Sequence, residues 1–302
     1  DDLEQKTRAY VLSNKQGYFC IADTEPVGND TLYEQAWERA NKIVEDLGKE
    51  VASTSDVLTS LLPELLSSNN NMIWQFGHGL AKGASNIELL WRQFHHSLTT
   101  LPENKRNYSL LRGFIEAANT RDPAVVNQLM DEALKDPVLS PFFPILQSSY
   151  PIDEAGAKRL ILSIAQGDAP TLHYSHLMSL RVSDSIQLPF FREILIGIAS
   201  LPNGYPIAID IFKMRLHSLQ SNKTPIDSNT SLLGRELLKL NEFQDGSSNH
   251  AYHVNEVAVA CMVGDAASQD ATTICTKLAR ALVDYRSGTM QYSELIRTLF
   301  RL

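Results

Sequence analysis

Two histidines and a glutamate near the end of the chain have the spacing of metal ligands on a helix. His250 and His253 are three positions apart, and Glu256 follows His253 by three more. Because residues three apart share one face of a helix, these side chains point the same way, as zinc ligands must. The sequence therefore allows a helical metal-dependent hydrolase that uses this cluster. It contains no HExxH motif, and partly exposed polar side chains are the alternative interpretation.

A second set of polar residues fits binding rather than catalysis. It consists of three pairs on predicted helices: Asn127 and Asp131, His173 and His176, and Lys213 and His217. The members of each pair are three or four positions apart, so each pair shares a helix face. We expect these residues to lie on the second helix of successive helix pairs and to line a surface that recognises another macromolecule.

Other patterns that commonly signal catalysis are missing. The segment Gly77–Gly83 contains a lysine but lacks the GxxxxGK[ST] order of a phosphate-binding loop. We expect its glycines to end a helix that begins at Met72 and to form a tight turn. No GxSxG sequence marks a serine nucleophile. Cys261 and Cys275 lie on apolar stripes, where cysteine usually acts as a small hydrophobic residue. We therefore predict no catalytic residue and no cofactor.

Composition narrows the class of protein. At 302 residues, with 43% apolar and 21% charged residues, the chain has the composition of a soluble folded protein. The net charge is −8 and the basic residues are scattered, which argues against a nucleic-acid partner. No stretch approaches the roughly 20 apolar residues that a membrane span needs. Three cysteines without a CxxC pair favour a reduced, cytoplasmic setting.

A repeated pattern of proline and methionine indicates the elements that must position these residues. Its three copies are Pro123, Met130 and Pro141; Pro170, Met178 and Pro189; and Pro206, Met214 and Pro225. Each methionine precedes the second proline of its copy by eleven positions. Repetition over about 35–50 residues is typical of stacked helical repeats. We expect proline to start the second helix of each pair, and methionine to fill the packing between stacked helices.

The pattern divides the chain into three regions. Residues 1–29 form an N-terminal arm, residues 30–103 an N-terminal helical region, and residues 104–302 the helical-repeat region. In the arm, the apolar runs 8–12 and 18–22 flank a turn that ends at Gly17, which predicts a β-hairpin. A lone hairpin is only marginally stable, so this one should pack against the helices.

The helix-pair pattern over about residues 104–285 resembles HEAT-type and related α-solenoid proteins. The signatures of tetratricopeptide and ankyrin repeats are absent. The segments Phe76–Ala81, Leu90-Trp91 and Gly234–Leu238 also resemble helical regions of large bacterial multidomain proteins. Some such proteins carry an NTPase or nuclease module and act in phage defence. That resemblance implies a sensor or scaffold.

Together these observations predict an all-α, elongated α-solenoid of HEAT-like or TPR-like helix pairs with a small N-terminal β-hairpin. The favoured function is recognition or scaffolding of a protein partner through the concave surface of the stack. Complementary shape and charge would suffice, without covalent chemistry. The chain starts without methionine and ends in an apolar run, so we expect a segment of a larger polypeptide. The partner and the oligomeric state stay open.

Overall fold

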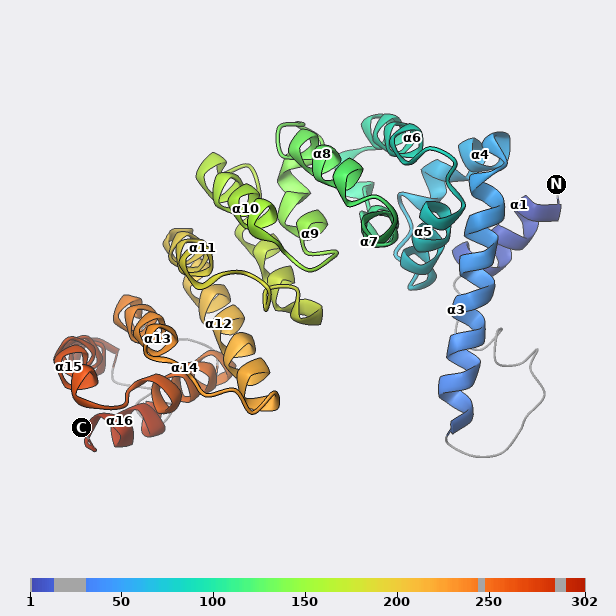
Figure 1. Cartoon of the computed structure of the whole chain (residues 1–302). Helices are drawn as coiled ribbons and strands as arrows, with labels where there is room; N and C mark the ends of the chain where they lie inside the picture. Colours follow the sequence, from blue (N-terminus) through green and yellow to red (C-terminus); the bar gives the residue numbers. More distant parts are fainter. Residues whose placement is uncertain (1, 14–30, 244–247, 286–291, 302) are drawn as a thin grey trace. The chain divides into compact units, whose positions relative to one another are not determined.

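The computed structural model describes residues 2–13, 31–243, 248–285 and 292–301. Every regular element within these ranges is helical, which confirms the predicted all-α class. The chain divides into two compact units, Asp1–Tyr150 (unit 1) and Pro151–Leu302 (unit 2). Figure 1 shows the helices of each unit, coloured along the sequence.

The predicted N-terminal β-hairpin is wrong. Residues expected to form its first strand continue a helix instead: α1 (Asp2–Thr7) runs directly into a turn of π-helix at Arg8–Leu12. Arg8 pairs with Glu4 one turn earlier and with Glu64, and Val11 is fully buried. Contacts with the helical body therefore override the β-propensity of this run. The predicted turn and second strand, within residues 14–29, lie outside the described residues.

The helices of unit 1 alternate between two layers. One layer contains α3 (Thr31–Ala52), α5 (Met72–Gly83), α7 (Ser109–Arg121) and the short α9 (Phe143–Gln147). The other contains α4 (Ser55–Leu65), α6 (Ile87–Thr100) and α8 (Pro123–Ala133). Single turns of 3₁₀-helix, Glu103–Lys105 and Ser140–Phe142, lie in the connections. Within each layer every helix packs against the next, and apolar side chains such as Phe94 and Phe114 meet edge to face between the layers.

Glycines set the spacing of the first layer. A Cβ at Gly79 would lie 2.9 Å from the carbonyl carbon of Glu45, and one at Gly48 would lie 2.9 Å from the Cα of Gly79. Helices α5 and α7 also approach closely, because a Cβ at Gly77 would overlap the backbone of Leu110. The predicted turn at Gly77–Gly83 is therefore wrong, because these glycines lie inside or at the end of α5 and let its backbone touch α3 and α7.

A nearly buried carboxylate joins α3 to α5. Glu45, only 15% exposed, accepts hydrogen bonds from Gln75 and Lys82 of α5, pairs with Lys49 on its own helix, and lies 3.2 Å from His78 Nδ1. Burial alone would raise its pKa, but the hydrogen bonds from Lys49 and Lys82 outweigh burial and hold the pKa of Glu45 at about 2. Unit 1 is thus stabilised by this carboxylate only while it is ionised.

Glu45→Gln should destabilise unit 1 at neutral pH by about 2 kcal/mol. Water partly screens the two ion pairs of Glu45, because the side chains of Lys49 and Lys82 are partly exposed. The folded pKa lies below the unfolded value. The stabilisation is therefore complete above about pH 5 and is lost as pH falls toward 2. Urea denaturation from pH 7 to pH 3 should show the wild-type and variant curves converging. Glu50→Gln, at an exposed position of the same helix, is the control; a constant gap for Glu45→Gln would contradict the assignment.

Unit 2 repeats the two-layer design. Its first layer contains α10 (Glu154–Gln166), α11 (Leu188–Ser200), α13 (Ser228–Leu240) and α15 (Asp265–Tyr285). The second contains the 3₁₀-helix η4 (Thr171–Arg181), α12 (Gly204–Ser221), α14 (Ser248–Cys261) and α16 (Ser293–Leu299). Each helix again packs on the next one in its layer. Capping follows the sequence, since the Asp153 and Asp227 side chains accept hydrogen bonds from the first turns of α10 and α13.

This arrangement is compatible with a helical-repeat fold, but the three proline–methionine copies are not successive units of one repeat. From Met178 on η4 the chain reaches Met214 on α12 by way of α11 alone. Between Met130 on α8 and Met178 it passes through both α9 and α10. The packing differs as well, because Met130 is fully buried whereas Met178 and Met214 are only half-buried. Of the three methionines, which were expected to fill the packing between stacked helices, Met130 alone lies fully within the core.

Candidate binding groove

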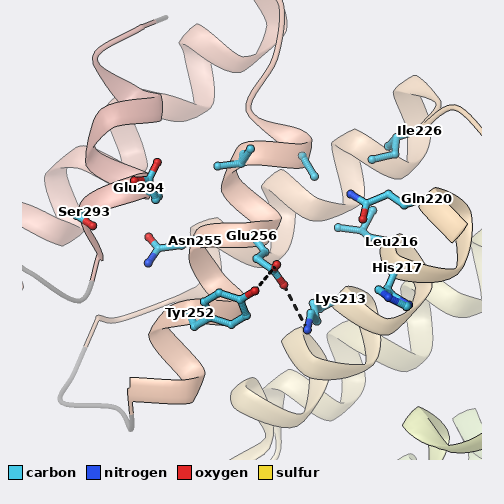
Figure 2. A pocket seen from close by; sticks show the side chains of 12 residues that line it. Lys213, Leu216, His217, Gln220, Ile226, Tyr252, Asn255, Glu256, Ser293 and Glu294 are labelled. Atoms are coloured by element: carbon cyan, nitrogen blue, oxygen red, sulfur yellow. Dashed lines mark hydrogen bonds and ion pairs between the residues drawn. The ribbon is translucent and has the colours of Figure 1, made fainter.

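An open groove crosses the second layer of unit 2. It has a volume of about 700 Å³ and is lined by residues from α12, α14 and the start of α16, with Ile226 from the loop before α13. Figure 2 shows its side chains and the interactions between them. The groove contains Lys213, His217 and Glu256, three residues to which the sequence gave a possible role.

Helical spacing explains how the walls form. On α12 the lining residues are Lys213, Leu216, His217 and Gln220, and on α14 they are Tyr252, Asn255, Glu256, Val259 and Ala260. Steps of three and four bring each set onto one helix face. Two apolar side chains of this groove are open to solvent, since Tyr252 is 55% and Val259 53% exposed, whereas Leu216 is buried. These two residues were missed by the sequence reasoning, although they continue the helix face of Glu256.

One ionic cluster spans the groove. Glu256 accepts a hydrogen bond from the Tyr252 hydroxyl at 2.7 Å and pairs with the ammonium of Lys213 at 3.3 Å. The Lys213 ammonium also lies 5.5 Å from the centre of the Tyr252 ring, within range of a cation–π interaction. Burial alone would raise the pKa of Glu256, but the bonds from Tyr252 and Lys213 lower it below its usual range. Glu256 is therefore ionised at neutral pH.

The predicted metal ligands point into the interface between α12 and α14. His253 Nδ1 pairs with Asp210 of α12, and Glu256 pairs with Lys213 of the same helix. The ring of His250 packs edge to face on Tyr205, and burial lowers its pKa. Among the described residues, no group of three or more His, Cys, Asp or Glu side chains is placed to hold a metal ion. The metal site stays a prediction that metal analysis of the purified protein would test.

The other predicted binding residues lie elsewhere. His173 and His176 are half-buried on η4, where successive turns of a 3₁₀-helix place them on one face. Asn127 and Asp131 belong to α8 of unit 1, the first half-buried and the second exposed. The structure thus brings Lys213, His217 and Glu256 together in one groove, and the histidines of η4 and the α8 pair do not line it.

Asn255 and the start of α16 complete the groove. The Asn255 side-chain oxygen accepts a hydrogen bond from the backbone N–H of Leu295 at 2.9 Å, which ties α16 to α14. Ser293 and Glu294 then lie on the wall opposite α12. No spacing rule could have identified these residues, because their place depends on how α16 packs against α14.

Comparisons with protein families, with curated proteins and with solved structures find no match for this chain. The family resemblances suggested by the sequence therefore gain no support from relatives. None of the helices in the described part of the chain combines the length and apolar character that crossing a membrane would require.

Proposed function

We propose that this protein recognises another protein, and that an extended segment of the partner binds the groove between α12, α14 and α16. The observation that carries this proposal is the groove itself, with open apolar side chains beside a fixed ionic cluster. Its volume of about 700 Å³ lies within the range of roughly 300–1,000 Å³ that is typical of ligand-binding clefts. A short stretch of polypeptide fits such a site, and a folded domain does not.

The layered helices support a solenoid as the setting for this groove. Each helix of a layer packs on the next, so exposed faces of neighbouring helices form one surface. In unit 2 the groove crosses three successive helices of the second layer. We propose that each unit is built from HEAT-like helix pairs, as the helix-pair pattern of the sequence predicts.

Recognition of this kind suits a scaffold or the sensor part of a larger bacterial defence protein. The resemblance of Phe76–Ala81 and Gly234–Leu238 to such proteins supports this role. A sensor needs a preformed surface that selects its ligand by shape and charge, and this groove supplies both.

Val259→Asn should weaken partner binding without unfolding unit 2. Val259 is 53% exposed in the groove, so a neutral polar side chain there costs little stability but removes apolar contacts with a bound segment. Affinity capture from the natural host, followed by quantitative mass spectrometry, measures the effect. We expect at least one protein whose recovery drops about tenfold or more, which corresponds to the loss of one well-packed contact.

Leu162→Asn is the matched control. Leu162 lies on α10, is 54% exposed and does not line the groove. Its variant should capture the same proteins as the wild type, and thermal melting should show both variants folded. If every captured protein is retained equally by Val259→Asn, the proposed function is wrong.

A further inference from the structure

The groove holds one cation of its own. The ammonium of Lys213 lies between an aromatic face and a carboxylate, 5.5 Å from the centre of the Tyr252 ring and 3.3 Å from Glu256 Oε2. The Tyr252 hydroxyl donates to the other oxygen of Glu256, which fixes the carboxylate against the ring. Two residues one turn apart on α14 thus form a site for a positively charged group (Figure 2).

The balance of charge in the groove is acidic. Its lining contains two carboxylates, Glu256 and Glu294, and one lysine, Lys213. Glu294 is also contacted by Arg297 on its own helix, and its side chain is still 47% exposed. His217 is the remaining titratable group of the lining, apart from the Tyr252 phenol. The chain as a whole has a net charge of −8, so a basic ligand is attracted at long range as well.

We propose that the segment recognised by the groove is basic, and that its arginine or lysine side chain replaces Lys213 between Tyr252 and Glu256. This inference rests on the proposed function. Lys213 shows which chemistry the site accepts, because it is held there by the contacts that a partner's cation would make. An aliphatic residue beside that cation would lie on Val259, which is 53% exposed.

Arginine fits the site better than lysine does. Its planar guanidinium stacks on an aromatic ring and can donate two parallel hydrogen bonds to one carboxylate, whereas an ammonium is a point charge. A partner arginine therefore displaces the weaker internal ligand. Lys213 in turn acts as a competitor that must leave before the partner binds.

Selection of displayed peptides on the full chain tests the inference. We expect the selected sequences to contain arginine or lysine beside an aliphatic residue. The affinity of the best peptide, made synthetically and measured by calorimetry, should rise about fivefold with Lys213→Met, because the internal competitor is removed. It should fall about tenfold with Glu256→Gln, because the charged acceptor is lost.

The design separates two kinds of failure. Val259→Asn removes the apolar contact without adding a charge that would attract a basic segment. If no selected peptide loses affinity with Val259→Asn, the groove is not a peptide site and the proposed function fails together with the inference. If selected peptides depend on Val259 but are acidic or uncharged, or if Lys213→Met weakens their binding, only the inference is wrong. Leu162→Asn should leave every affinity unchanged, and the melting temperature of each variant confirms that it is folded.

Discussion

Gly113→Ala is expected to destabilise unit 1 by about 3 kcal/mol or more, which is a large share of the roughly 5–15 kcal/mol that holds a typical domain together. A Cβ at this position would overlap the carbonyl oxygen of Trp74 and lie 2.8 Å from its carbonyl carbon. Carbon atoms pack at about 3.5–4.0 Å, so α7 would have to move away from α5. Because the overlap is with backbone, no side-chain rotation can relieve it.

Alanine is a better helix former than glycine by about 1 kcal/mol, so helix propensity alone would predict that Gly113→Ala increases stability. Gly197→Ala on α11 provides the control, since its Cβ would meet only the side chain of Ile164, at 3.1 Å. That side chain can shift, and we expect a change of about 1 kcal/mol at most. Guanidinium denaturation followed by circular dichroism measures both variants. Equal stabilities for the two would show that α5 and α7 do not touch through backbone.

The glycines of α5 and α7 show where sequence reasoning was limited. Glycine is the poorest helix former except for proline, yet these two helices contain Gly77, Gly79, Gly83 and Gly113. Local propensity favours a turn at Gly77–Gly83. The close approach of α3 and α7 reverses that preference, and neither neighbour can be identified from the local segment.

Local signals succeeded where both partners of an interaction are close in sequence. Pro123 was expected to start a helix, and it is the first residue of α8, where the Asp122 side chain accepts a hydrogen bond from Val125 N. The spacing of Val254, Val257 and Ala258 is likewise typical of a helix, and all three are fully buried on α14. Such features depend on three or four neighbouring residues alone.

The groove could be predicted only in part. Helical spacing correctly placed Lys213 with His217 on one face of α12, and Glu256 on a face of α14. It could not show that the two faces oppose each other. The spacing of His253 and Glu256, which suggests metal ligands, also matches two residues one turn apart on the neighbouring helix, Asp210 and Lys213. Ion pairs between two helices and a metal site share the same periodicity, so spacing alone does not distinguish them.

Asp270→Asn is expected to cost unit 2 about 3–5 kcal/mol, the usual consequence of leaving a buried charge without its partner. Arg235 on α13 is only 7% exposed in its side chain and donates to Asp270 of α15 at 2.9 Å and to the Cys261 carbonyl at 3.1 Å. Lys239 donates to the other oxygen of the same carboxylate at 2.7 Å. Burial would raise the pKa of Asp270, but the bonds from Lys239 and Arg235 outweigh it and lower the pKa.

Glu236→Gln tests whether burial is the cause. Glu236 pairs with Arg192 in two hydrogen bonds, but the arginine side chain is 55% exposed, so water can replace the lost partner. We expect a loss of at most about 1 kcal/mol from thermal or guanidinium unfolding. Similar losses for Asp270→Asn and Glu236→Gln would mean that water reaches Arg235.

A compensating change distinguishes the penalty of an unpaired charge from the net value of the ion pair. Replacing Arg235 with methionine in the Asp270→Asn background removes the buried guanidinium, and Lys239 can reach solvent because it is 32% exposed. The double variant should therefore regain most of the stability that Asp270→Asn loses. If it is no more stable than Asp270→Asn, the loss comes from broken packing between α13, α14 and α15. Full recovery would mean that the pair adds little net stability, and that the cost of the single change comes from the unpaired Arg235 guanidinium.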